Sequence, residues 1–273
     1  MINIDLLNTN IKTFSILHDL IPLKCNWLVS WNTKMVQNYM LQVNNLKKYN
    51  NLLANSEFTK NECSDVFTNI VTVGTGANVK NKSFSDDQIK TTLNKFGINN
   101  KYIFCQTQFG INKSLHLLVN QYNLLPNHIK DDVLLVFGVG GIPSNYINTY
   151  NMNRPNIIIT GYLNEDDLWI LHEMAWLFVF PSSYEGFGLP PVEAMCHNKP
   201  VIVAKNTSLI EVMGNDNFMF NNIDNSCVDL ICKLYNDENF YNECKSYCFA
   251  RKDLFTWDNV YDKFLNTIKL ALY

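Results

Sequence analysis

The chain is short of several features that would point to particular classes of protein. Only two of its 273 residues are arginine, Arg154 and Arg251, and the net charge is -3. Nucleic-acid binding needs concentrated positive charge, so this balance excludes a general phosphate-backbone binder. No apolar run reaches the roughly 18 residues that a membrane-spanning helix requires, and the first residues lack the basic and apolar regions of a signal peptide. We therefore expect a cytoplasmic protein without a transmembrane segment or a nucleic-acid partner.

The eight cysteines do not form a pattern that suits a metal or a disulfide framework. None of them belongs to a C-x-x-C pair, the spacing that is typical of structural zinc sites.

Hydrophobic residues make up 47% of the chain, enough for a large core, and asparagine occurs 40 times. The length suggests one large domain or two of ordinary size.

Short β-rich runs alternate with helical periods from Phe14 onward, which is the signature of a parallel sheet wrapped by helices. The predicted strands cover 14–18, 52–55, 70–73, 102–106, 133–138, 156–160, 175–180, 200–204 and 218–220. The predicted helices cover 33–48, 86–96, 113–125, 165–173, 191–196, 224–235, 239–251 and 256–270. The fold class is therefore α/β.

A linker of small and polar residues, 74–84, separates two parts of unequal size. We predict a partial α/β domain over 1–75, a linker and connecting helix over 76–98, and a second domain over 99–273. The second part holds six strands, enough for a complete doubly wound domain. The first holds only three, which would leave sheet edges and apolar faces uncovered.

The most informative segment is FPSSYEGFGLPPVEAMCHNKP, residues 180–200. A strand enters a loop with two glycines, and a helix follows whose first turn is marked by two prolines. This arrangement exposes backbone N–H groups at a positive helix end, which suits a diphosphate or the hydroxyls of a sugar. Glu185 precedes the loop and Glu193 lies within the helix, so both carboxylates can point into one cleft.

The string P-S-x-x-E-G-F-G-L-P-x-x-E-A-M, followed by P-V-I, resembles the donor-binding motif of glycosyltransferase family 4, whose members are retaining enzymes of the GT-B fold. Other segments are similar to the same family. They are ILHDLIPL at 16–23, LANSEFTK at 53–60, LLVFGVGG at 134–141, GYLNEDDL at 161–168 and LIEVMG at 209–214. The resemblance implies a complete C-terminal Rossmann-like domain and a partial N-terminal one that lacks the first part of the acceptor domain.

The resemblance also implies roles for individual residues. Glu193 would hold the ribose diol and Glu185 the transferred sugar, and Lys113 would bind phosphate. His18 matches a histidine that faces the donor sugar across the interdomain cleft. Backbone N–H groups that would bind sugar hydroxyls and phosphate belong to Gly186, Phe187, Gly188 and Leu189. The family is generally metal-independent, and the chain has no D-x-D triplet for a divalent cation, so we expect no metal and no cofactor.

The chain departs from the family pattern in three places. The phosphate-binding arginine is replaced by Gln108, and the glycine before it by Thr107, which weakens the stabilisation of the departing diphosphate. The small residues that usually end the motif helix are Cys196, His197 and Asn198. The strand and glycine-rich loop that open the family's acceptor domain are not seen before the first predicted strand.

The resemblance favours a retaining transferase that moves a hexose from GDP- or UDP-hexose to a glycan or lipid-linked acceptor. The sequence H-D-L-I-P, frequent in mannosyltransferase-like members, favours GDP-mannose. One alternative is a non-catalytic subunit that binds a nucleotide or sugar. Another is a donor half that works beside a separate chain, so that the isolated chain would transfer weakly.

Overall fold

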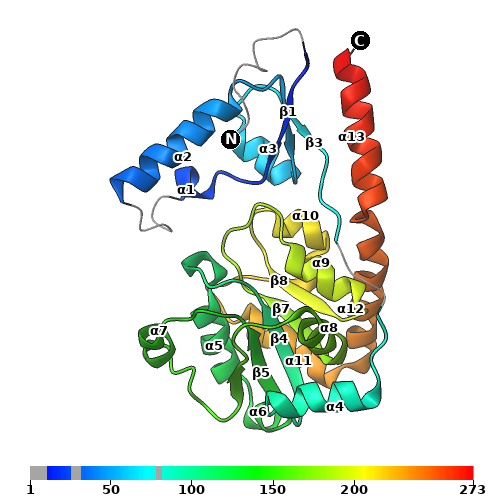
Figure 1. The fold of residues 1–273 in the computed structure, drawn as a ribbon. Coiled ribbons are helices and arrows are strands. Elements are labelled where there is room, and N and C mark those ends of the chain that lie inside the picture. Colours follow the sequence, from blue (N-terminus) through cyan, green and yellow to red (C-terminus); the bar gives the residue numbers. More distant parts are fainter. Residues whose placement is uncertain (1–10, 26–31, 78–81, 273) are drawn as a thin grey trace. The chain divides into compact units, whose positions relative to one another are not determined.

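The computed structural model describes residues 11–25, 32–77 and 82–272, and they form two compact units (Figure 1). The smaller unit takes its residues from 1–76, 185–187 and 255–273, and the larger from 77–184 and 188–254. This division differs from the predicted domain limits in three segments. Residues 77–98, predicted as a linker and connecting helix, belong to the larger unit, and residues 185–187 and the last helix belong to the smaller one.

The smaller unit is built on a three-stranded parallel sheet in the order β1-β2-β3. Its strands are β1 (Phe14–Leu17), β2 (Asn51–Ala54) and β3 (Ile70–Thr72). Its helices are α1 (Ile21–Lys24), α2 (Thr33–Leu46), α3 (Glu57–Cys63) and α13 (Trp257–Leu272). A cluster of buried side chains joins strands and helices: Leu17, Leu20, Val43, Leu52, Cys63 and Phe67. Burial of these apolar groups is the main force that holds the small sheet to its helices.

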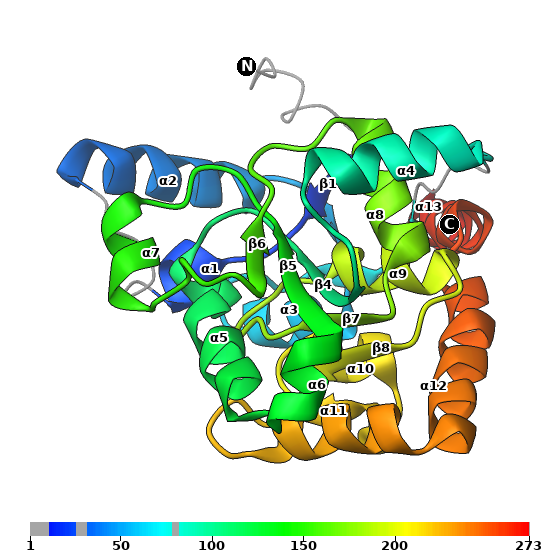
Figure 2. The same ribbon diagram turned by 90° about the horizontal axis from the view of Figure 1, so that it is seen from below.

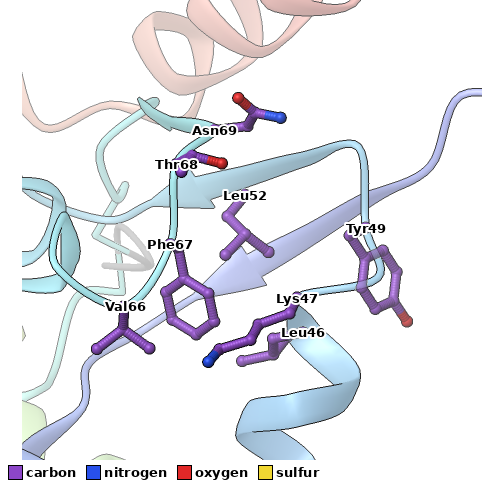
Figure 3. A pocket seen from close by; sticks show the side chains of 8 residues that line it. All are labelled: Leu46, Lys47, Tyr49, Leu52, Val66, Phe67, Thr68 and Asn69. Atoms are coloured by element: carbon purple, nitrogen blue, oxygen red, sulfur yellow. The ribbon is translucent and has the colours of Figure 1, made fainter.

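A shallow hollow of about 210 Å³ lies at the amino-terminal edge of this small sheet (Figure 3). Its apolar lining comes from Leu46, Leu52, Val66 and Phe67, and its polar lining includes Lys47 and Asn69. None of the predicted site residues lines this hollow.

The larger unit contains a six-stranded parallel sheet in the order β6-β5-β4-β7-β8-β9. Its strands are β4 (Lys101–Gln106), β5 (Val133–Gly138), β6 (Ile157–Ile159), β7 (Leu177–Phe180), β8 (Val201–Ala204) and β9 (Met219–Phe220). Every residue of β5, β7 and β8 is buried. Such uninterrupted burial requires helices on both faces of the sheet, as in doubly wound folds (Figure 2).

Within the described part of the chain, the larger unit contains nine α-helices, one before its first strand, two after its last strand and the others between consecutive strands. They are α4 (Asp86–Lys95), α5 (Leu115–Leu124), α6 (Asn127–Asp132), α7 (Ser144–Thr149), α8 (Glu165–Met174), α9 (Leu189–Cys196), α10 (Leu209–Met213), α11 (Ser226–Asn236) and α12 (Glu238–Arg251). Among the described residues, no helix has both the length and the apolar character needed to cross a bilayer.

All nine predicted strands and all eight predicted helices are present, with ends shifted by a few residues, so the predicted α/β class is confirmed. One predicted boundary is wrong in a way that affects the site. Lys113 does not open a helix, because it ends a 3₁₀ turn, Ile111–Lys113. Ser114 then takes a left-handed conformation with φ of 54°, and α5 begins only at Leu115.

Candidate functional site

The order of strands in the larger sheet points to one place where a ligand can bind. From β4 the chain proceeds outward through β5 to β6, and from β7 it proceeds in the opposite direction through β8 to β9. The connections therefore diverge between β4 and β7. In open α/β sheets, ligands bind beyond the carboxyl ends of the strands at such a switch point.

A hollow of about 260 Å³ occupies that point. It is lined by residues that end or follow β4 and by residues of α9, the helix that follows β7. They are Gln106, Thr107, Gln108, Lys113, Leu189, Pro190 and Glu193. The structure thus brings together four predicted donor-binding residues from segments about 80 positions apart: Gln108, Lys113, Leu189 and Glu193.

The hollow offers a cation, a carboxylate and neutral amides. Burial raises the pKa of Glu193 above its ordinary value, and Lys113 lines the same space. A carboxylate can accept hydrogen bonds from a diol, and an ammonium can donate to a phosphate. Gln108 is exposed, and its amide can donate hydrogen bonds but carries no charge.

The start of α9 depends on Gly188. This residue precedes the helix with φ of 102°, a conformation that side chains other than glycine rarely adopt. A Cβ at this position would also approach the Cδ2 atom of Leu209 to 2.6 Å. The backbone conformation therefore favours glycine at this position, and the Leu209 side chain would have to shift to admit a Cβ. Because Pro190 and Pro191 carry no N–H, Leu189 supplies the amide of the first turn of α9 up to Val192.

The other predicted residues belong to the smaller unit, where Gly186 and His18 lie together. A Cβ on Gly186 would collide with the backbone oxygen of His18. The Gly186 carbonyl accepts hydrogen bonds from Ser56 Oγ at 2.5 Å and Thr59 Oγ1 at 2.9 Å. His18 itself is exposed just after β1, within reach of solvent.

The residues on either side of Gly186 are buried in the same unit. Glu185 is 8% exposed, and Phe187 is 7% exposed. The ring of Phe187 meets that of Phe255 edge-on, with centroids 5.7 Å apart. The predicted site residues therefore fall into two groups, one in each unit, and the glycine loop contributes to both.

Sequence reasoning missed Ser56 and Thr59, which hold the glycine loop, because the helix α3 was not predicted. The signal was present locally. Ser56 accepts a hydrogen bond from the Thr59 N–H as the N-cap of α3, and a serine before a polar, acidic first turn is a common start of a helix.

Among the described residues, no three His, Cys, Asp or Glu side chains are grouped as a metal would need. Metal independence nevertheless remains a prediction, because a bound nucleotide can itself supply ligands to a cation.

Each of the two α/β units contains a parallel sheet, and the larger unit has a polar hollow at its switch point. These features define a protein of the doubly wound class. Residues 85–251 match the family model of the glycosyl transferases group 1. The chain therefore belongs to the group 1 glycosyl transferases.

Relatives of known name are consistent with this family. The serotype-specific mannosyltransferase WbdA of Escherichia coli is 29% identical over 262 residues, which are 91% of this chain and 32% of that protein. O-antigen chain mannosyltransferase B of Escherichia coli is 35% identical over 112 residues, 40% of this chain and 29% of that protein. The chain spans about a third of the length of these relatives.

Solved structures show the same fold at low sequence identity. Sucrose-phosphate synthase from Thermosynechococcus elongatus superposes with a TM-score of 0.76 at 17% identity, over 97% of this chain and 69% of that one. HepE of Anabaena, in complex with UDP and glucose, gives a TM-score of 0.75 at 18% identity, over 94% and 71%. The predicted GT-B type of fold is confirmed.

Proposed function

We propose that the chain is a family 4 glycosyltransferase, or the part of one, that transfers a hexose from a nucleotide sugar with retention of configuration. The observation that carries the proposal is the hollow at the switch point, where Lys113 and Glu193 line one space. A nucleoside diphosphate needs a cation for its phosphates and an acceptor for its ribose diol, and these two side chains supply one of each.

In this proposal each site residue has a distinct task. Lys113 and the N–H groups of the glycine loop hold the diphosphate, and Glu193 accepts from the ribose. Glu185 and His18 face the transferred sugar. The departing β-phosphate takes the proton of the acceptor hydroxyl, so that the chain needs no separate general base and no metal. Its main contribution to the rate is orientation.

We propose GDP-mannose as the donor and a glycan or lipid-linked sugar as the acceptor. The H-D-L-I-P segment, residues 18–22, supports mannose, as do relatives that are named mannosyltransferases. HepE, which was solved with UDP-glucose, supports a nucleotide sugar in general. We also propose that the reaction takes place in the cytoplasm. The domain formed by residues 99–273 would make most of the contacts with the donor.

A non-catalytic protein that binds a nucleotide sugar is the second candidate. Gln108 favours it, because an uncharged amide stabilises a leaving diphosphate less than a guanidinium does. The comparisons lend no support to a separate chain that completes the acceptor side.

The test compares Glu185→Gln with Glu193→Gln, using GDP-mannose and UDP-glucose as donors. Glu193→Gln should weaken nucleoside diphosphate binding about tenfold or more, the effect of losing a charged hydrogen bond. Glu185→Gln should leave that binding within about twofold but lower donor turnover by about two powers of ten, because charge develops at the sugar in the transition state.

Titration of GDP and UDP gives the first quantity, and release of the nucleoside diphosphate from the sugar donors gives the second. Wild-type protein that binds the nucleotide sugar but never releases the diphosphate would favour the non-catalytic candidate. Wild-type protein that binds neither GDP nor UDP would contradict both.

A further inference from the structure

Two hydroxyl groups at the start of α3 hold a single carbonyl of the glycine loop. Ser56 Oγ lies 2.5 Å and Thr59 Oγ1 lies 2.9 Å from the Gly186 oxygen. Both side chains are buried, at 2% and 1% exposure. A carbonyl oxygen has two lone pairs, so the two hydroxyls can satisfy it completely.

The proton of each hydroxyl can be assigned from the distances. Ser56 Oγ accepts the Thr59 N–H at 2.9 Å, which leaves its own proton for Gly186. Thr59 Oγ1 has one proton and two carbonyls nearby, and Gly186 at 2.9 Å is closer than His18 at 3.3 Å. The Gly186 carbonyl is therefore the principal acceptor of both hydroxyls.

The loop backbone is also pressed against the end of β1. A Cβ on Gly186 would strike the His18 oxygen and come within 3.0 Å of the Asp19 Cβ. Backbone atoms cannot yield as a flexible side chain can, so only glycine fits there. The same close approach brings Gly186 to the hydroxyls of α3.

Fixing this carbonyl fixes the plane of a peptide. The peptide is planar and trans, so the N–H of Phe187 is held in the direction opposite to the Gly186 carbonyl. On the other side of the same glycine lies the backbone of Glu185. A rotation of the plane would move both neighbours, and both belong to the proposed donor site.

We propose that Ser56 and Thr59 are positioning residues of the transferase, which orient the segment Glu185–Phe187 toward the donor sugar by holding the Gly186 carbonyl. This inference rests on the proposed function and adds two residues to it. Neither residue would touch the substrate. Their effect would be on kcat. A misoriented loop would still allow the donor to bind, but it would stabilise the transition state less than the correctly oriented loop does.

The first arm of the test measures the anchoring without any substrate. Thr59→Val keeps the shape of the side chain but removes the hydroxyl, while Thr59→Ser keeps the hydroxyl. Hydrogen exchange of the peptide covering 184–189, in the full chain, should be about tenfold faster in Thr59→Val and as in wild type in Thr59→Ser. Thr267→Val is the matched control, since Thr267 Oγ1 is buried in α13 and donates to the Lys263 oxygen, away from the loop.

The second arm measures hydrolysis of GDP-mannose, in which water takes the mannosyl group and GDP is released. Thr59→Val should lower kcat about tenfold with KM and GDP affinity changed less than about twofold, as expected when an interaction acts on the transition state alone. Thr59→Ser should restore kcat. The kcat of the double variant Ser56→Ala, Thr59→Val should be about a hundredfold lower than that of wild type. The kcat of the control Thr267→Val should stay close to that of wild type.

The two arms separate the possible failures. Unchanged exchange at 184–189 in Thr59→Val would overturn the anchoring itself. Faster exchange in a variant whose kcat matches wild type would overturn the positioning role. Faster exchange in a protein whose wild type neither binds nor cleaves a nucleotide sugar would overturn the proposed function, while the anchor would stand.

Discussion

Gln108 lies in the switch-point hollow, where the resemblance implies an arginine, and its amide carries no charge. We predict that Gln108→Arg tightens the binding of GDP or UDP about tenfold. A charged hydrogen bond contributes roughly 1.5–3 kcal/mol. Solvent exposure and the rotamer freedom that a long side chain loses should offset about half of that.

Titration of both nucleotides at one fixed salt concentration tests this, because ions screen phosphate contacts. Gln37→Arg adds the same charge at an exposed position of α2 in the smaller unit and serves as the control. Equal or weaker binding in Gln108→Arg would mean that the phosphate lies elsewhere, and the proposed role of Lys113 would then be lost.

At the scale of residues, the sequence predicted several residues that line the candidate site but not the contacts of the glycine loop. Glu193 and Lys113 could be named because local motifs surround them, and the hollow brings them together. Ser56 and Gly186 are 130 positions apart. No local preference encodes a hydrogen bond over that distance, since it depends on how whole elements pack.

At the scale of elements, Gly188 shows how one position determines the start of a helix. We predict that Gly188→Ala lowers the free energy of unfolding by about 2–3 kcal/mol. About 1–2 kcal/mol would come from the strained backbone, and the rest from the contact with Leu209. Gly97→Ala is the control: Gly97 has φ of 69°, but no atom lies within 4 Å of the added Cβ.

Urea unfolding of the two variants separates strain from contact. Gly97→Ala should lower the free energy of unfolding by only about 1 kcal/mol. If both variants lose the same amount, Leu209 gives way without cost and the close approach at α9 does not constrain the sequence.

A histidine of α8, His172, stacks on His197, the residue that follows the end of α9. The rings of His172 and His197 are nearly parallel with centroids 5.4 Å apart, and His172 also stacks on Phe178 at 5.3 Å. His172 is fully buried, and neither of its ring nitrogens has a hydrogen-bond partner within the described part of the chain. Burial lowers the pKa of His172 well below its ordinary value and that of His197 to about 4.

These depressed pKa values predict a loss of stability in acid. Unfolded histidines bind protons as the pH falls through about 6.5, while the folded pair stays neutral toward pH 4. The stability is therefore complete above pH 6.5 and falls below it, by at most about 1.4 kcal/mol per pH unit for each imidazole. His172→Phe keeps an aromatic ring in the stack and should roughly halve that slope.

Urea unfolding at pH 7, 6 and 5 measures the slope, with His128→Phe as the control at an exposed position. A slope in His172→Phe equal to that of wild type would show that other groups cause the acid sensitivity.

The strands were predictable even where they are short, whereas the helices were predictable only where they are long. Strands of a parallel sheet are buried on both faces, so they appear as short apolar runs such as Leu177–Phe180. Helices of four to seven residues, such as Ile21–Lys24 and Glu57–Cys63, were missed. Periodicity needs a window of 11 or more residues to be detected, and left-handed Ser114 gives no pattern that would separate the turn at Lys113 from the helix after it.

At the scale of the whole molecule, the division into units does not follow the order of the chain. Residues 77–184 belong to the larger unit, the next three residues to the smaller, and Gly188 to the larger again. A linker rich in small residues can be found from composition, but an exchange of three residues between units cannot. It is visible only when the packing around Gly186 and Phe187 is known.

The whole chain should bind a nucleoside diphosphate without a divalent cation. Among the described residues that line the hollow, Glu193 supplies a single carboxylate. A hard divalent cation prefers several oxygen ligands, so one carboxylate is a poor site for it. At a free concentration a hundred times its Kd, GDP would add about 2.7 kcal/mol of stability. A protein of this size gains roughly 2–4 °C per kcal/mol, so Tm should rise by about 5–10 °C. That rise should be the same in EDTA and in Mg²⁺, and Glu193→Gln at the same GDP concentration should reduce it in both. A rise that disappears in EDTA and returns with Mg²⁺ or Mn²⁺ would show that the phosphates are held through a metal, and the task proposed for Lys113 would pass to that ion.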